Sequence, residues 1–440
     1  MDKESVLSYI DQHEEELIDF LKETIRINSE NAGMGTPGLK EEAIAKYLAD
    51  YLGSAGFKVD MFAGDPEGKR LNVCAVLPGK KESKDNKNLI ISAHTDTVLA
   101  TEIEKWTVDP FGGEEIDGKI FGRGANDMKG GLAAAVFAAK AIIDNKIETA
   151  GDVILMLSAG EESGEGGMIG VKACVDRGYT APFAIVCEPS GLELHSASVS
   201  ALCFDLIVYG KTIHVCNRNQ VMFPQSSHQM SGEAIGVDAV EKALPLIHFF
   251  YRLEKEWNHR YNGKSAVGTG GIGGHDMQGV GVFCINPSFI KSGTMLGAVP
   301  GEVKITYAIW HPPEVSHDEM LSEIREKVAL LAQTDAWLKE NPPEIIGPLF
   351  PWRGFVTDDT IAPAEQFKRS FKDVMSAPPV VTGMRCTCDA TYLFERDIPV
   401  VVCGPGKLSD GAHGCDEFVS RDDVLNAAKI YASFIFDWCK

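Results

Sequence analysis

Apolar residues recur at two spacings along the chain, and each spacing predicts a different kind of element. Near the start, residues 6–25 place apolar side chains at the three-to-four-residue spacing of an amphipathic helix, and residues 41–52 repeat that pattern. Later, short apolar runs rich in β-branched residues indicate buried strands, and these alternate with helical stretches such as 128–143. The expected strands are 71–77, 88–92, 153–157, 183–187 and 399–402. This order predicts an α/β fold in which helices cover both faces of a mostly parallel sheet.

The middle of the chain has a different pattern and predicts a separate α+β domain. Residues 199–209 alternate apolar and polar positions as a half-exposed strand does, and a helix is expected over 232–256. A second strand and a second helix are expected over 303–310 and 318–332.

The length of 440 residues exceeds what one hydrophobic core usually organises, so two domains are expected. We expect the first domain to comprise residues 1–193 and 350–440, interrupted by the α+β domain at 194–349. The glycine-rich stretch 263–281 is expected to be a loop of the inserted domain, and the proline-rich stretch 340–352 is expected to be a linker back to the first domain.

Composition and charge narrow the class of protein. The chain is 44% hydrophobic and 24% charged, which is typical of a globular protein. Its first residues do not resemble a secretion signal, and no apolar run is long enough to span a membrane. A net charge of −21 disfavours nucleic acid and anionic membranes as partners. Eleven cysteines, mostly single within apolar runs, indicate free thiols. We therefore expect a cytoplasmic protein with a small-molecule substrate.

Residue types that bind metals follow four of the predicted buried strands. In chain order they are His94 and Asp96, Glu161 and Glu162, Glu188, and His413. Asp127 stands just before the predicted helix at 128–143. Because the site of an open α/β sheet lies beyond the carboxyl ends of its strands, these side chains are expected to converge in one crevice.

Such a cluster of carboxylates and imidazoles keeps its charges only if cations lie among them. Mixed histidine and carboxylate ligands suit zinc, with cobalt or manganese as alternatives. Two divalent ions sharing a carboxylate favour hydrolysis, because together they activate water and polarise a carbonyl. Adjacent residues at a strand end point in different directions, so one of Glu161 and Glu162 can bind metal while the other moves a proton. Asp96 can hold the second ring nitrogen of His94.

Several longer strings carry a family resemblance. HTDTV, GRGANDMKGG, GEESGEGG, EPS and the closing TCDA, CGPG and H..DEFV stand in this order along the chain. They resemble the dinuclear-zinc metallopeptidase and aminoacylase family, which includes glutamate carboxypeptidase, acetylornithine deacetylase, succinyl-diaminopimelate desuccinylase and aminoacylase. The resemblance implies hydrolysis of an amide C–N bond in a small carboxylate-bearing substrate, such as an N-acyl amino acid or a dipeptide.

The resemblance also implies a role for each residue of the cluster. One metal ion is expected on His94 and Glu188 and the other on Glu162 and His413, with Asp127 bridging them. Asp96 is expected to support His94, and Glu161 to act as the general base. The inserted domain is expected to be a lid that mediates homodimerisation. His214, in the string GKTIH, is expected to reach the partner subunit's site and stabilise the oxyanion.

The inserted domain departs from the family at the place where relatives grip a substrate carboxylate. No arginine occurs between Arg260 and Arg325, so Arg218, Arg385 and Lys291 are candidates to replace the missing cation. This difference leaves open a non-peptide substrate, such as a compact aromatic amide or amine. Two alternatives therefore remain: a metal-dependent deaminase that releases an amine from a non-acyl carbon, and a non-catalytic metal-binding partner protein.

Overall fold

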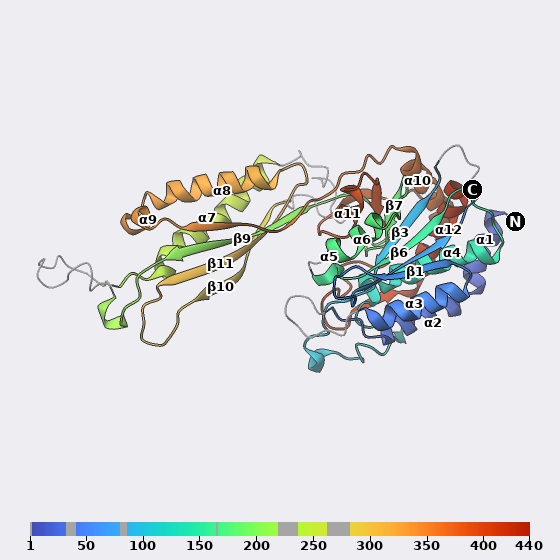
Figure 1. Ribbon diagram of the computed structural model, residues 1–440, viewed down its shortest axis with the longest axis horizontal. Coiled ribbons are helices and arrows are strands. Elements are labelled where there is room, and N and C mark those ends of the chain that lie inside the picture. The colour runs from blue at the N-terminus through green and yellow to red at the C-terminus, as the bar shows by residue number, and fades with distance from the viewer. Residues whose placement is uncertain (1, 32–40, 80–85, 164–165, 219–235, 262–281) are drawn as a thin grey trace, which may run out of the picture. The chain divides into compact units, whose positions relative to one another are not determined.

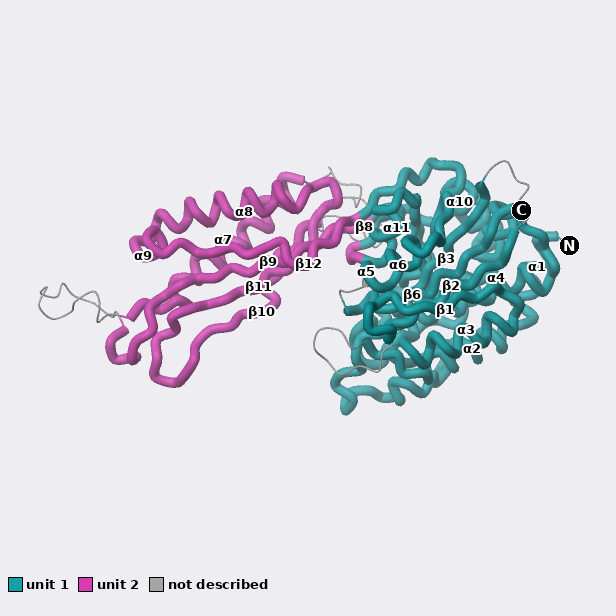
Figure 2. The backbone as a smooth tube through the Cα atoms, in the orientation of Figure 1, with its two compact units in different colours: residues 1–197, 355–384, 388–440 teal, residues 198–354, 385–387 magenta. Residues whose placement is uncertain are grey.

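The computed structural model describes residues 2–31, 41–79, 86–163, 166–218, 236–261 and 282–440. The chain divides into two compact units, which Figure 2 shows in different colours. Unit 1 comprises Met1–Ala197, Phe355–Met384 and Cys388–Lys440, and unit 2 comprises Ser198–Gly354 and Arg385–Thr387. The glycine-rich stretch 263–281, expected to be a loop, lies outside the described residues.

Unit 1 is built on an eight-stranded sheet whose order is β1-β2-β6-β3-β7-β14-β8-β13. Figure 1 labels β1, β6, β3 and β7 of this sheet. The strands are β1 (Lys58–Ala63), β2 (Leu71–Leu77), β3 (Leu89–His94), β6 (Val153–Ser158), β7 (Ala184–Val186), β8 (Leu194–Ser198), β13 (Val381–Met384) and β14 (Val400–Val402). The central strands β6, β3, β7 and β14 are parallel, and β1 and β2 extend the sheet antiparallel on one side. Every residue of these four central strands is buried, which explains their continuous apolar runs and confirms the predicted α/β class.

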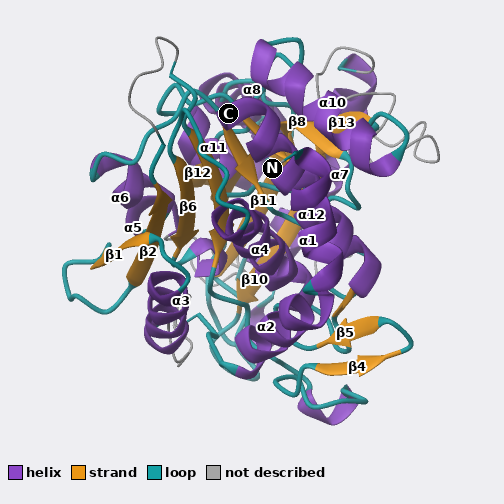
Figure 3. Ribbon diagram, turned by 90° about the vertical axis from the view of Figure 1, so that its right-hand side faces the viewer, coloured by secondary structure: helices purple, strands orange, loops and turns teal. Residues whose placement is uncertain are grey.

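Helices cover both faces of this sheet (Figure 3). On one face α4 (Gly130–Asp144) packs against α12 (Arg421–Cys439), with α1 (Lys3–Gln12), α2 (Glu14–Arg26) and α10 (Ala362–Met375) beside them. On the other face α6 (Val171–Asp176) packs against α11 (Ala390–Phe394), next to α5 (Gly166–Ile169). A further helix, α3 (Glu42–Ser54), packs against β1 and β2.

The helical pattern over residues 6–25 corresponds to two helices rather than one. The helix α1 ends at Gln12 and α2 begins at Glu14. Three glutamates in the first turn of α2 favour a helix start there, because negative charge is stabilised at a helix N-terminus.

A small three-stranded sheet lies next to the start of α4. Its strands are β4 (Glu114–Ile116), β5 (Lys119–Phe121) and β15 (Phe418–Ser420), in the order β15-β5-β4. The antiparallel pairing of β15 with β5 brings the chain after His413 against residues 122–127.

Unit 2 has an antiparallel sheet in the order β10-β11-β9-β12. Its elements are β9 (Ser200–Tyr209), β10 (Cys284–Ser292), β11 (Glu302–His311) and β12 (Glu344–Trp352), with the helices α7 (Ala239–Arg260), α8 (His317–Ala332) and α9 (Ala336–Glu340). Alternate residues of β9, including Phe204, form a buried core with Tyr307 of β11 and Phe250 of α7. Within the described part of the chain, no helix is both long and apolar enough to cross a bilayer.

Two expectations for this unit are corrected by the structure. The proline-rich stretch 340–352, expected to be a linker, contains the edge strand β12, which pairs with β9. Its register shifts between Ile346 and Leu349 and again between Leu349 and Trp352, around its two inner prolines, and an edge strand tolerates proline because one row of its N–H groups has no strand partner. The helix expected from residue 232 begins at Ala239, where the Asp238 side chain caps it.

Candidate metal centre

The predicted ligands lie at the carboxyl ends of the central parallel strands. His94 is the last residue of β3, Glu161 and Glu162 follow β6, and Glu188 follows β7. Asp127 lies in the turn Ala125–Lys129 before α4. Gly131, in the first turn of α4, allows this helix to approach β7, because a Cβ there would lie 2.1 Å from the carbonyl oxygen of Cys187. The close approach brings Asp127 to Glu188.

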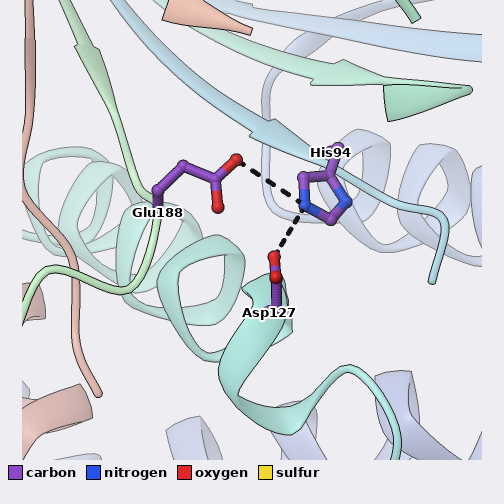
Figure 4. Close-up of side chains that lie close together, drawn as sticks. All are labelled: His94, Asp127 and Glu188. Carbon is purple, nitrogen blue, oxygen red and sulfur yellow. Dashed lines mark hydrogen bonds and ion pairs between the residues drawn. The ribbon is translucent and has the colours of Figure 1, made fainter. Parts of the chain in front are cut away.

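His94, Asp127 and Glu188 form the first ligand group. Figure 4 shows both carboxyl groups directed at the same ring nitrogen of His94. The Nε2 atom of His94 lies 3.0 Å from Oδ1 of Asp127 and 3.7 Å from Oε1 of Glu188. All three residues are buried. The ligand atoms of the group lie within 4.8 Å of one another, which is close enough for one ion to bind them all.

Asp127, Glu162 and His413 form the second ligand group, so Asp127 belongs to both. The Nε2 atom of His413 lies 3.1 Å from Oε2 of Glu162 and 3.5 Å from Oδ2 of Asp127. The two oxygens of Asp127 therefore face different histidines, Oδ1 towards His94 and Oδ2 towards His413. The side chain of His413 is 56% exposed, so this group opens to solvent.

Burial opposes ionisation of the carboxyl groups of the centre. Burial raises the pKa of Glu161 and of Glu188 well above the usual value, and the negative charges of neighbouring carboxylates add to the rise. Burial also raises the pKa of Glu162. Burial opposes ionisation of Asp127 as well, but hydrogen bonds to His413 and His94 hold its pKa below the usual value.

The pKa values of both histidines of the centre are raised. Hydrogen bonds to Asp127 and Glu162 raise the pKa of His413 to about 10. Burial opposes protonation of His94, but its hydrogen bond to Asp127 and the charge of Glu188 raise its pKa well above the usual value. The carboxylates thus require positive charge among them, and imidazole and carboxylate groups are the donors that divalent zinc, cobalt and manganese accept. The residues fit a two-ion centre.

Asp96 is the buried anchor of the loop that carries Glu161 and Glu162. Its Oδ1 accepts hydrogen bonds from the main-chain N–H groups of Gly160 (2.9 Å) and Glu161 (3.2 Å), and its Oδ2 accepts one from that of Glu162 (3.0 Å). It contacts His94 through its main-chain carbonyl, 2.9 Å from Nδ1, whereas its carboxylate oxygen Oδ1 lies 3.8 Å from Nδ1. The side chain of Asp96 therefore holds the loop, and its main chain orients the ring.

Polar side chains that the sequence analysis did not single out complete these contacts. Asn31 donates its amide to Oδ2 of Asp96, and Arg70 connects Asn31 to the buried carboxylate of Glu41. A second buried pair, Arg123 and Glu417, lies beside Asp127.

Asp389, at the N-cap of α11, also went unnoticed in the sequence. It accepts a hydrogen bond from the Ser158 hydroxyl at 2.8 Å, and burial raises its pKa to about 6. Its signal was present in the string TCDA, as an acid directly preceding the apolar positions of a helix.

The remaining predicted residues belong to unit 2. His214 is exposed, and its Nδ1 accepts a hydrogen bond from the main-chain N–H of Cys216 at 3.3 Å. Arg218 is ion-paired with both Asp238 and Glu241, each at 3.1 Å. Lys291 lies exposed on β10, opposite Lys304 of β11. Arg385 belongs to unit 2 although it follows β13 of unit 1.

An α/β sheet that presents two groups of histidine and carboxylate side chains at its strand ends is typical of metal-dependent hydrolases. The chain matches the peptidase family M20/M25/M40 over residues 90–437 and belongs to that family. It is therefore a hydrolase of C–N bonds, and the family resemblance noted in the sequence is confirmed.

Relatives in the family act on different amides. The chain is 31% identical over 451 residues to the N-formyl-4-amino-5-aminomethyl-2-methylpyrimidine deformylase of Bacillus subtilis, an alignment that covers 99% of this chain and 97% of the relative. It is 33% identical over 428 residues to the succinyl-diaminopimelate desuccinylase of Rickettsia africae, covering 96% of this chain and 99% of the relative. Both relatives are named for the removal of an acyl group from nitrogen.

Solved structures share the fold. Aminopeptidase PepT from Bacillus cereus superposes with a TM-score of 0.69 and 19% identity, covering 97% of this chain and 99% of that chain. Human carnosine dipeptidase 1 gives a TM-score of 0.68 and 17% identity, covering 99% of this chain and 98% of that chain. At these identities the likeness concerns the fold alone.

Proposed function

We propose that this protein holds two divalent ions and hydrolyses the amide bond of a small N-acyl amine. The observation that carries the proposal is the position of Asp127, whose two oxygens face His94 and His413 respectively. His94, Asp127 and Glu188 would hold one ion, and Asp127, Glu162 and His413 would hold the other. When bound, the two ions polarise the scissile carbonyl and acidify the attacking water. Zinc is the first choice, with cobalt or manganese as alternatives.

Glu161 is the proposed general base. Among the described residues it belongs to neither ligand group, yet it is adjacent to Glu162, which belongs to the second group. A carboxylate beside the ligands can accept the proton of the attacking water and then deliver it to the leaving nitrogen. The carboxylate of Asp96 keeps Glu161 in place, because its Oδ1 accepts a hydrogen bond from the main-chain N–H of Glu161.

His214 is the proposed oxyanion donor, acting in the site of a partner subunit in a homodimer. Its Nδ1 accepts a hydrogen bond from Cys216, so its Nε2 carries the proton in the neutral ring and is available to donate. A molar mass in solution equal to that of a single chain, at all concentrations tested, would contradict the dimer. The eleven free cysteines support the cytoplasm as its location.

For the substrate, we place formamides of compact aromatic amines ahead of N-acyl amino acids and dipeptides. Two observations support this order: the near full-length match to the B. subtilis pyrimidine deformylase, and the absence of arginine from the sequence between Arg260 and Arg325. Arg218, a candidate replacement, is already neutralised by two carboxylates, so we do not retain it as a substrate ligand. Arg385 and Lys291 remain candidates for substrate binding.

Product analysis tests the proposal. Metal-loaded protein is incubated with an N-formyl aminomethylpyrimidine, N-succinyl and N-acetyl amino acids, dipeptides and unacylated aromatic amines, and released formate, acid or ammonia is quantified. We expect formate from the formamide at the highest kcat/KM. Ammonia from an unacylated amine, without acyl cleavage, would favour the deaminase instead. Removal of metal with a chelator should abolish turnover and re-addition should restore it; full activity in demonstrably metal-free protein would contradict the two-ion centre.

A further inference from the structure

We propose that Glu417 is a positioning residue that holds Asp127 and His413 in place and thereby sets the affinity of the second ligand group for its ion. This inference rests on the two-ion centre proposed above and adds a residue outside both ligand groups. Glu417 lies four residues after His413, directly before β15, and is 1% exposed.

The carboxylate of Glu417 is surrounded by donors that belong to the turn carrying Asp127. Its Oε1 accepts the main-chain N–H groups of Asn126 and Asp127, each at 3.0 Å. Its Oε2 accepts the main-chain N–H of Gly124 at 3.0 Å and Nη1 of Arg123 at 2.5 Å. A buried carboxylate with four donors fixes the main chain of this turn, because moving the turn would leave both the charge and the N–H groups unpaired.

The ion pair of Arg123 and Glu417 also holds the loop that carries His413. Nη2 of Arg123 donates to the main-chain carbonyl of Gly414 at 2.8 Å. His413 and Asp416 both have a positive φ, 62° and 54°, a conformation that is uncommon for residues other than glycine, although His and Asp adopt it more readily than most. Glu417 and Arg123 therefore connect the turn of Asp127 to the loop of His413.

The two ligand groups depend on this connection to different degrees. In the first group, His94 ends β3 and Glu188 follows β7, so neighbouring parallel strands hold two of the three ligands. In the second group, Asp127 and His413 both depend on Glu417 and Arg123. Loss of the Glu417 carboxylate should therefore lower the affinity of the second group for its ion more than that of the first group.

The test compares metal binding by full-length Glu417→Gln and wild-type protein after chelation. Glutamine keeps the shape, but both oxygens of Glu417 face only donors, so its amide NH₂ would meet donors in either orientation. Stepwise titration with Co²⁺, followed by its visible absorption, and calorimetry with Zn²⁺ report each ion. We assign the weaker step to the second group, because its His413 is 56% exposed whereas all residues of the first group are buried. We expect this step to lose about 10- to 100-fold in affinity, which is typical when a group that orients a ligand is removed, and the tighter step to change by less than about threefold.

Glu323→Gln is the matched control. Glu323 accepts hydrogen bonds from Nη1 of Arg260 at 2.8 Å and from Nε1 of Trp257 at 3.1 Å. This variant therefore also loses an arginine-bound carboxylate, but within unit 2, to which none of the five proposed ligands belongs. Both metal-binding steps should remain as in wild type. The unfolding temperature of each metal-free variant shows whether the substitution acts on the fold as a whole.

The outcomes separate this inference from the proposed function. A wild-type protein that binds a single ion contradicts the two-ion centre. A folded Glu417→Gln variant whose affinities equal those of wild type, whatever the number of ions, overturns the positioning role, and so does an equal loss in both steps. If Glu417→Gln does not fold, Arg123→Lys replaces it, because lysine keeps the cation but cannot bridge Glu417 and Gly414 as a guanidinium does. In either variant, a selective loss in the weaker step supports the inference, and unchanged binding or a selective loss in the tighter step overturns it.

Discussion

Replacing Asp96 by asparagine should reduce catalysis through the loop that carries the general base. Oδ1 of Asp96 accepts hydrogen bonds from Gly160 and Glu161, and Oδ2 accepts them from Glu162 and Asn31. The side chain is fully buried, so no water replaces a lost partner. Asparagine keeps one oxygen, and its NH₂ must face two donors in either orientation.

The expected magnitude follows from this count. A hydrogen bond to a charged acceptor contributes about 1.5–3 kcal/mol, so the loss of two costs about 3–6 kcal/mol. The loop can relax, and part of the cost then appears as lower stability and part as displacement of Glu161. If half of the cost is borne by the transition state, about 1.5–3 kcal/mol corresponds to a fall of about 10- to 100-fold in kcat/KM.

The assay is steady-state hydrolysis of the best substrate, with metal content and unfolding temperature measured in parallel. Asp335→Asn is the control, because Asp335 likewise accepts main-chain N–H groups, from Trp337 and Leu338, but caps α9 in unit 2. A folded Asp96→Asn variant with kcat/KM within threefold of wild type would refute the reasoning. A loss that disappears at saturating metal would show instead that Asp96 acts through His94.

Three further outcomes are expected. Glu161→Gln should lower kcat by about 10²–10⁴-fold while metal content stays at the wild-type level, and reduced metal content would make Glu161 a ligand instead. Mixing His214→Ala chains with Glu161→Gln chains should restore part of the activity in hybrid dimers, and failure despite proven hybrids would count against a shared site. In metal-free protein, the pKa of His413 is raised to about 10, above its unfolded value of about 6.5. Protonated His413 therefore contributes stability that is fully present below about pH 6.5 and is lost as the pH rises through about 10. The difference in unfolding temperature between wild type and His413→Ala should therefore shrink over that range, and a constant difference would contradict it.

The sequence predicted the central strands and the convergence of the proposed ligands because both follow from one physical constraint. A strand buried on both faces must be apolar throughout, as β3 and β6 are, so the first polar residues after it mark the strand end. Parallel strands end at the same edge, and polar residues from distant segments are thereby brought together. The strand β12 escaped detection because its prolines are typical of linkers, although its alternating exposure is that of a strand.

The groups that hold the ligands were less accessible to sequence reasoning, because their partners are set by tertiary register. Glu417 stands 294 residues from Arg123 along the chain, and Asn31 stands 65 residues from Asp96. No periodic pattern connects such pairs. The one available signal was the string DEFV, in which Glu417 directly precedes apolar residues, since a carboxylate that becomes buried requires nearby donors.

Asp96 contacts His94 as expected, but through its main-chain carbonyl and not through its carboxylate. Its position two residues after His94 predicted a carboxylate on the same side of an extended chain, beside the imidazole. The strand β3 ends at His94, however, so the alternation of side chains does not continue to Asp96. Three main-chain N–H groups of residues 160–162 converge at that point, and a buried carboxylate is more stable against several N–H donors than against a single ring nitrogen. The carbonyl of Asp96 then remains for Nδ1 of His94, so one residue connects the ring of a metal ligand with the loop of the proposed base.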